Sequence, residues 1–134
     1  QPLEGTYVDE HRIHREWYEI PPATRDALRA ARRVVAVGTT AVRVLETAAR
    51  TKAESGWTDL YVTPPHRFAA VDSLITNFHL PRSSLLLLVT AFVQHGMGSG
   101  ATAFEARDRL LGAYREALRE GYRFFSFGDA MLVL

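Results

Sequence analysis

Short apolar runs alternate with longer amphipathic stretches along the first half of the chain. Residues 34–37 are entirely apolar, which is typical of a strand that is covered on both faces. Helices are predicted on either side of it, over 23–33 after two prolines and over 41–53 after a Gly-Thr-Thr turn. Residues 13–20 mix aromatic and branched residues with charges, a pattern that predicts an earlier strand.

The second half of the chain continues the same alternation. A strand is predicted over 59–63 and a strongly apolar helix over 82–95, followed by a glycine-rich loop over 94–101. An amphipathic helix over 102–120 and a final buried strand over 130–134 complete the pattern. The helix over 102–120 carries five large apolar residues, Phe104, Leu110, Leu111, Tyr114 and Leu118. We therefore expect an α/β fold in three layers, with helices flanking a mostly parallel sheet.

Composition narrows the class of protein. With 134 residues, of which 47% are hydrophobic and 23% charged, the chain is expected to fold as one domain or part of one. The absence of cysteine excludes disulfides, thiolate zinc sites and cysteine nucleophiles from this sequence. The longest apolar run, 85–93, is far shorter than the ~20 residues of a membrane span. These features favour a cytoplasmic protein without a membrane anchor, and a start at Gln1 without methionine favours a fragment.

The first candidate site is the Gly-Thr-Thr turn that leads from the apolar strand into a helix. The start of a helix presents unpaired N–H groups and the positive end of the helix dipole, which together favour an anion. Thr39 and Thr40 add hydroxyls there, and Arg43 on the first turns can reach a bound phosphate or carboxylate. The alternative is that a threonine merely caps the helix and that Arg43 is solvated.

The second candidate lies in the strand predicted over 13–20. His11, His14 and Glu16 suggest a metal site, but residues three apart on a strand point to opposite faces. His14 and Glu16 are two apart and share a face, where a carboxylate beside an imidazole suits proton transfer near neutral pH. Proton transfer is therefore favoured over metal binding.

The third candidate is the segment 72–81, which places polar residues between apolar ones. Asp72, Thr76, Asn77 and His79 would each need a partner if buried, and such groups can hold a ribose or a base edge. The alternative is a structured turn, with Ser83 helping to cap the next helix.

The fourth candidate is the segment 122–129, in which arginine and glycine interrupt a run of aromatic residues. Arg123 and its aromatic neighbours can clamp a base, although two or three of the rings are expected in the core. Asp129 precedes the last predicted strand, where its carboxylate can act as a base, bind a hydroxyl or cap a helix.

These four segments together resemble one family, the S-adenosylmethionine:tRNA ribosyltransferase-isomerases of queuosine biosynthesis. The stretches that match are HRIHREWYEIP, VVAVGTTAVRVLE, FAAVDSLITNFHLPRSSLLLLVTAF and YRFFSFGDAML, in the order of the family. The chain departs from the family pattern at residues 64–66 and in the glycine-rich insertion after Phe92.

The resemblance implies a two-domain enzyme of which residues 1–134 are the C-terminal portion of the α/β catalytic domain, without the β-barrel domain. The implied reaction moves the ribosyl part of S-adenosylmethionine onto 7-aminomethyl-7-deazaguanine at the tRNA wobble position. It gives epoxyqueuosine, adenine and methionine. It requires no metal and no cofactor beyond the co-substrate. The implied partners are tRNA, S-adenosylmethionine and the rest of the same enzyme.

Roles for single residues follow as a hypothesis from the resemblance. Four side chains form the pool expected to transfer protons: His14, Glu16, His79 and Asp129. Three are expected to hold the ribose or the modified base: Asp72, Thr76 and Asn77. Three are expected to bind the methionine carboxylate or a phosphate: Thr39, Thr40 and Arg43. Arg82 and Arg123 are expected to contact the tRNA backbone or anticodon.

Two other classes of function stay open at this point. A non-catalytic RNA-binding or scaffolding module is one, although a net charge of +1 weighs against a purely electrostatic RNA binder. A metal-dependent hydrolase that uses His11, His14 and His79 is the other.

Overall fold

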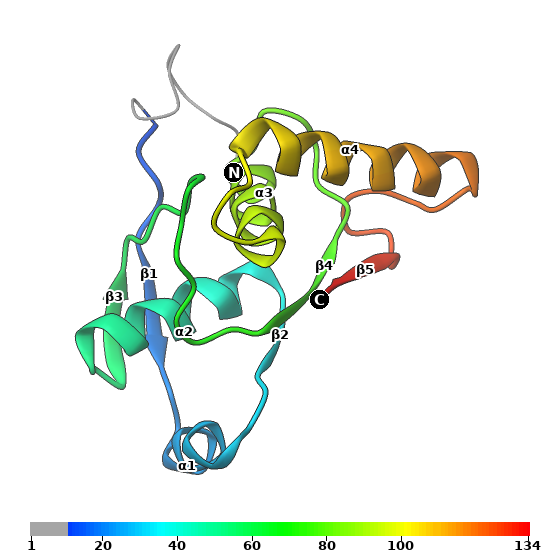
Figure 1. Ribbon diagram of the computed structural model, residues 1–134. Helices are drawn as coiled ribbons and strands as arrows, with labels where there is room; N and C mark the ends of the chain where they lie inside the picture. The colour runs from blue at the N-terminus through cyan, green and yellow to red at the C-terminus, as the bar shows by residue number, and fades with distance from the viewer. Residues whose placement is uncertain (1–10) are drawn as a thin grey trace.

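The computed structural model describes residues 11–134, and Figure 1 shows how their helices and strands are arranged. Within this range the elements are, in chain order, β1 (Glu16–Glu19), α1 (Pro22–Ala30), β2 (Val35–Val37), α2 (Thr39–Thr51), β3 (Ser55–Thr58), β4 (Ser73–Asn77), α3 (Ser84–Met97), α4 (Ala103–Arg119) and β5 (Ala130–Val133). The four predicted helices are confirmed, each within three residues of its predicted bounds.

The central sheet has the strand order β2-β4-β5. Strand β2 runs parallel to β4, with Val37 opposite Ile75, whereas β5 runs antiparallel to β4, with Ala130 opposite Asn77. The middle strand, β4, lies inside the polar segment 72–81 that we treated as a possible turn. Its buried positions include Ser73 and Thr76, so hydrophobicity alone did not mark it as a strand.

A separate ribbon is formed by β1 and β3, which pair antiparallel with Trp17 opposite Trp57. The strand predicted over 59–63 was wrong in position, because β3 occupies residues 55–58 directly before it. Pairing with β1 decides this position, as tertiary context commonly overrides local propensity in strands. The segment 59–63 is not a strand; it packs against the hydrophobic core through Val62, which is almost fully buried.

The α/β class is confirmed, and the sheets are mixed. Of the three strand pairings among residues 11–134, one is parallel and two are antiparallel, so the expectation of a mostly parallel sheet is corrected. For β5 the physical reason is that two helices, α3 and α4, separate it from β4, so the chain re-enters the sheet at the edge where β4 ended.

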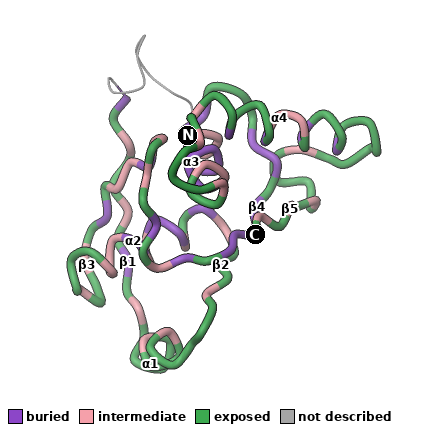
Figure 2. Tube along the Cα trace, viewed as in Figure 1, coloured by how far each residue is buried: buried purple, intermediate pink, exposed green. Residues whose placement is uncertain are grey.

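The two faces of the central sheet differ in burial. Ala36 and Leu74 pack into the core with residues of α2, α3 and α4, whereas Val35, Val37 and Leu132 are exposed on the other face. Figure 2 shows the buried positions along β4 and the inner sides of α2 and α3. Helix α1 has no buried residue. The described residues thus cover one face, and the third layer remains an expectation.

The helix ends show how the sequence sets the boundaries. Ser83 accepts a hydrogen bond from the Leu86 N–H and caps α3, which confirms the capping role proposed for it. Thr102 caps α4 in the same way through the Glu105 N–H. No helix among residues 11–134 has the length and apolar character needed to cross a membrane.

Helix α4 packs through a narrow stripe. Leu110 and Tyr114 lie in the core, but Phe104 and Leu118 are 69% and 60% exposed. The sequence pattern placed all of these residues on one amphipathic helix, and only the stripe that faces α3 is covered within the described chain.

Candidate functional site

Most of the predicted site residues lie at one edge of the central sheet. Parallel strands β2 and β4 end at the same edge, and α2 begins there directly after β2. Because β5 is antiparallel and begins opposite Asn77, Asp129 lies at this edge as well. Open α/β sheets bind their ligands outside the carboxyl ends of parallel strands. The topology therefore collects residues from four separate segments where a ligand is expected.

Five predicted residues line one cavity of about 170 Å³ at this edge: His14, Glu16, Thr39, Thr40 and Arg43. Ser84, at the start of α3, also lines it. The cavity joins β1, the first turns of α2 and the first turn of α3, three segments that are far apart in the sequence. The cavity thus brings together predicted residues of two of the four segments, while the predicted residues of the other two lie outside it.

Arg43 is the buried centre of this cluster. Its Nη1 lies 2.5 Å from the Glu16 carboxylate, its Nη2 donates to the His14 carbonyl at 3.0 Å, and its Nε donates to the Leu60 carbonyl at 3.0 Å. The alternative of a solvated Arg43 is therefore wrong. Its guanidinium is occupied by protein groups, and it positions β1 against α2.

The Glu16 carboxylate is consequently engaged by Arg43, whereas the sequence suggested a direct pair with the His14 imidazole. Glu16 and His14 still line the same cavity, as two residues on one face of a strand should. Their roles in proton transfer remain predictions.

The start of α2 has no side-chain cap. Gly38 occupies the N-cap position at φ 93°, a backbone conformation that favours glycine, and neither threonine caps the helix. The alternative of a capping Thr39 or Thr40 is therefore wrong. Thr39 is buried and Thr40 exposed, and both line the cavity beside the first turn of the helix.

His79 and Thr76 form a second, buried cluster at the end of β4. The His79 Nε2 lies 2.7 Å from the Thr76 hydroxyl, and the His79 backbone N–H donates to the Tyr114 hydroxyl at 3.0 Å. Burial lowers the pKa of His79 to about 4, so its imidazole is neutral at pH 7. This geometry suits a residue that holds the wall of a site in place.

Asp129 and Arg123 close the loop that precedes β5. The Asp129 carboxylate accepts from the Arg123 backbone N–H at 2.6 Å and from its Nε at 3.1 Å, and Arg123 lowers the pKa of Asp129. Asn77 donates to the Asp129 carbonyl at 3.1 Å and ties this loop to the end of β4. Asp129, predicted to transfer protons, and Arg123, predicted to contact tRNA, are therefore paired with each other.

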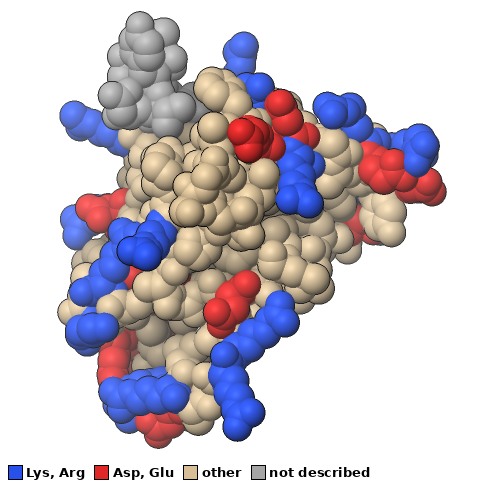
Figure 3. Space-filling view, viewed as in Figure 1, with Lys and Arg blue, Asp and Glu red and all other residues tan. Residues whose placement is uncertain are grey.

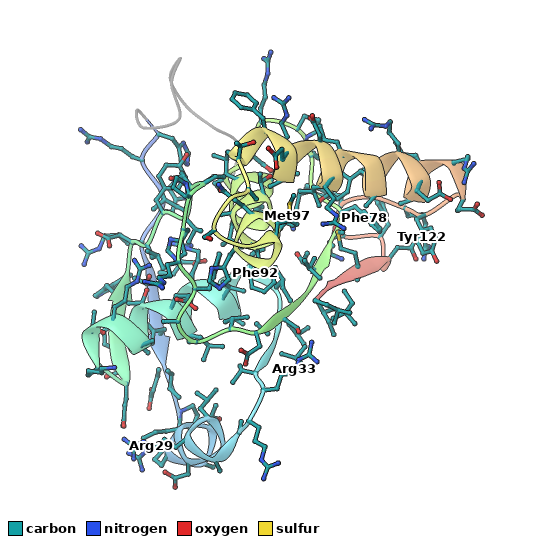
Figure 4. The ribbon with its side chains drawn as sticks, viewed as in Figure 1. Arg29, Arg33, Phe78, Phe92, Met97 and Tyr122 are labelled. Atoms are coloured by element: carbon teal, nitrogen blue, oxygen red, sulfur yellow. The ribbon has the colours of Figure 1, made fainter. Side chains whose placement is uncertain are left out.

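Aromatic rings support this loop from behind. The Phe78 ring stacks on that of Phe124 with centroids 5.0 Å apart, and Tyr122 approaches Phe78 at 6.1 Å. Figure 4 shows Phe78 and Tyr122 beneath α4. The expectation that some of these rings belong to the core is confirmed, since Phe78 is buried and Phe124 packs against the core.

Seven of the predicted residues do not line the cavity, and two of these, Asp72 and Arg82, also lie apart from the clusters at the end of β4. Asp72 precedes β4 at the opposite edge of the sheet, about 17 Å along the strand from Asn77. Its carboxylate accepts from the Val34 N–H at 2.7 Å and joins β2 to β4. Arg82 precedes α3 and faces a different hollow on the surface.

The sequence patterns did not single out three residues that shape the site. Tyr114 holds His79, Ser84 lines the cavity, and the fully buried Glu46 accepts hydrogen bonds from the backbone N–H groups of residues 69–71. A charged residue on the apolar stripe of α2 was the signal that could have identified Glu46 as buried and bonded.

No group of three or more His, Cys, Asp or Glu residues gathers within residues 11–134 at metal-binding distance.

An α/β fold whose polar side chains meet at the carboxyl edge of a sheet defines the class of α/β proteins that bind a ligand at that edge. Comparison with known proteins gives the family. A model described as queuosine biosynthesis protein matches residues 1–133, and the chain belongs to this family. The resemblance seen in the four motifs is confirmed.

The similar proteins include the S-adenosylmethionine:tRNA ribosyltransferase-isomerases of Moorella thermoacetica and Heliobacterium modesticaldum. They are 51% and 47% identical, and each comparison covers 100% of this chain but 38% of the relative. The chain thus spans well under half the length of these relatives. The crystal structure of S-adenosylmethionine tRNA ribosyltransferase from Thermotoga maritima is similar with a TM-score of 0.71 and 49% identity, over 88% of this chain and 40% of that one.

Proposed function

We propose that residues 1–134 form part of the catalytic domain of an S-adenosylmethionine:tRNA ribosyltransferase-isomerase. The enzyme would transfer the ribosyl part of S-adenosylmethionine to 7-aminomethyl-7-deazaguanine in tRNA and isomerise it to epoxyqueuosine, with loss of adenine and methionine. One observation carries the proposal: five predicted residues from two of the family-like motifs line one cavity at the carboxyl edge of the sheet, and Ser84 from a third motif lines it as well. Relatives of about 50% identity carry the name of this activity.

The cavity suits the anionic end of the co-substrate. The first turn of α2 lacks a side-chain cap, so its N–H groups and the hydroxyls of Thr39 and Thr40 can bind a carboxylate or phosphate. The Arg43 guanidinium is not available to this anion, because it is already bonded to Glu16 and to two backbone carbonyls. We assign Arg43 a positioning role rather than direct contact with substrate.

The reaction needs a group that removes the acidic proton next to the sulfonium and a group that supplies one to departing adenine. Among the four predicted residues, His14 and Glu16 line the cavity. His79 is buried, with a pKa of about 4, and its Nε2 faces Thr76. We therefore propose that His14 and Glu16 serve proton transfer, while His79 orients Thr76. Asn77 and Asp129 would meet the ribose or base at the same edge.

The cavity is too small for the whole reaction. Sites for small ligands commonly measure about 300–1,000 Å³, and this cavity measures about 170 Å³. Since the chain spans 38% of the length of its relatives, the remaining polypeptide would complete the pocket. We therefore expect residues 1–134 alone to be inactive, and the complete enzyme to act in the cytoplasm without a metal or a further cofactor.

Substitution of His14 and Asn77 by alanine in the full-length protein tests the proposal. Epoxyqueuosine formed in tRNA is measured by mass spectrometry, and Glu19→Gln on the exposed side of β1 serves as the control. We expect each alanine variant to lose at least about a hundredfold in turnover, the lower range for a group that transfers protons or positions substrate. Wild-type turnover in both variants would refute the proposed site, and no product from the wild-type enzyme would refute the proposed activity.

A further inference from the structure

A second hollow, of about 730 Å³, opens on the other side of the segment 61–64 from the cavity. Its walls come from this segment, from the first turns of α3 and from the first turn of α4. The start of α3 separates the two spaces, because Ser84 and Leu85 line the cavity while Ser83 and Leu86 line the hollow. The hollow therefore adjoins the candidate site without belonging to it.

The lining combines an apolar floor with two cations. Leu86, Leu87 and Ala103 form apolar surface, and Arg82 and Arg107 supply positive charge, while no carboxylate among residues 11–134 lines the hollow. On the face seen in Figure 3 basic and acidic side chains are interspersed, so this local excess of positive charge is not part of a general basic field. An occupant that is flat and apolar on one side and anionic on the other would complement it.

Phe104 supplies an aromatic face at the rim. Its side chain is 69% exposed on the first turn of α4, and the Arg107 guanidinium carbon lies 5.0 Å from its ring centroid. Arg107 also pairs with Asp108 at 3.2 Å on the exposed surface. The core gains little from an aromatic ring placed in this way, but a stacked base would use both the ring and the guanidinium.

Arg82 supplies a cation whose side chain has no hydrogen-bond or ion-pair partner among residues 11–134. Its backbone is left-handed, with φ 55°, a conformation that costs a non-glycine residue free energy. Such backbone strain is concentrated at functional sites. A phosphate near the mouth of the hollow would give the exposed guanidinium a partner that suits its geometry.

The geometry points to a binding site for a nucleotide of single-stranded RNA, with its base stacked on Phe104 and its phosphate held by Arg82. The inference rests on the proposed function, which supplies the RNA as the anticodon loop of the substrate tRNA. A loop that places the reacting base beside the cavity, at the carboxyl edge of the sheet, would present a neighbouring nucleotide across the first turn of α3. The hollow would thus bind an unmodified nucleotide beside the reacting one.

Binding of an anticodon stem-loop RNA to the full-length protein tests this site by fluorescence anisotropy over a range of salt concentrations. We expect Phe104→Ala to weaken binding about tenfold, and Phe104→Tyr to restore it, because stacking needs the ring rather than its identity. Arg82→Ala should reduce the slope of log affinity against log salt by about 1. Leu118→Ala and Arg119→Ala are matched controls, since both residues are exposed at the far end of α4.

Several results would overturn the inference. They are wild-type affinity in Phe104→Ala, equal losses in Leu118→Ala, or a lowered midpoint of thermal unfolding in Phe104→Ala with unchanged RNA affinity, which would assign the hollow to packing within the protein. A change in KM for S-adenosylmethionine without a change in RNA affinity would also overturn it. Turnover of the wild-type enzyme tests the proposed function separately. If the hollow does not bind RNA, the wild-type enzyme still forms epoxyqueuosine.

Discussion

The inner side of α2 and the hollow beside α3 and α4 both carry charged side chains, but those on α2 are buried and those at the hollow are exposed. Glu46 and Arg43 are buried on α2, and each makes several hydrogen bonds to groups distant in the sequence. Arg82 and Arg107 are exposed at the hollow, and Arg82 has no side-chain partner within residues 11–134. Buried charges must be paired to be tolerated, whereas exposed charges need no partner.

The difference separates residues that build the site from residues that can meet a ligand. Glu46 holds residues 69–71, which lead into β4, and Arg43 holds β1 beside α2. Substitution of either residue should therefore lower the stability of the fold, and affect ligand binding only as a consequence. Substitution of Arg82 should weaken ligand binding and leave the stability of the fold nearly unchanged.

Glu46→Ala should give the largest effect. The variant leaves the N–H groups of Ala69, Ala70 and Val71 without their acceptor and opens a cavity in a fully buried position. We expect a loss of about 3 kcal/mol or more in the free energy of unfolding, measured by urea denaturation. Glu46→Gln retains one acceptor oxygen and should lose less. Equal stability of wild type and Glu46→Ala would show that residues 69–71 find other partners.

Arg43→Ala should come next, with a loss of about 2–3 kcal/mol, because three groups lose a charged donor. Arg43→Lys keeps the charge but cannot reproduce the planar fork, and should recover only part of this. The matched control, Arg82→Ala, should change stability by less than about 0.5 kcal/mol. The comparison fails if Arg82→Ala destabilises the protein as much as Arg43→Ala.

The sequence predicted those parts of the fold that local pattern controls. Each helix was found because its apolar spacing and end residues act over a few neighbours, as with Ser83 before α3. Strand β4 was missed because Ser73 and Thr76 are buried polar residues, the first bonded to the distant Arg33 and the second to His79 three residues on. Strand β3 was misplaced because its register is decided by pairing with β1, whose residues lie 36 to 42 positions earlier in the chain.

The candidate site was predictable to the same extent. The motifs identified His14, Thr39 and Thr40, and the sheet topology brings them together. The internal pairing of Arg43 with Glu16, 27 residues apart, could not follow from either motif alone, since it depends on how β1 lies against α2. Asp72 belonged to the right motif but to the wrong end of its strand, a distinction that needs the strand direction.

His79 should make stability depend on pH. Its pKa is about 4 in the folded protein against 6.5 in the unfolded chain, so the unfolded state binds more protons between these values. Stability should therefore be complete above about pH 6.5 and fall as the pH drops toward 4, with a slope approaching 1.4 kcal/mol per pH unit. Urea denaturation at several pH values measures this slope. The His79→Gln variant should lack this component, and an unchanged slope in that variant would assign it to other groups.

Arg123 and Asp129 provide the smallest expected effect on stability, because the Arg123 side chain is exposed and Asp129 is only partly buried. Arg123→Ala should raise the pKa of Asp129 toward its ordinary value of 3.8, measured by NMR titration of the carboxyl carbon. The wild-type pair contributes stability above pH 3.8 and loses it as the pH falls through the lowered pKa of Asp129. At pH 7 the unfolding midpoint should stay close to that of wild type, as for Arg82→Ala. A large drop in that midpoint would show that Arg123 stabilises the fold, as Glu46 and Arg43 do, rather than being an exposed residue available to a ligand.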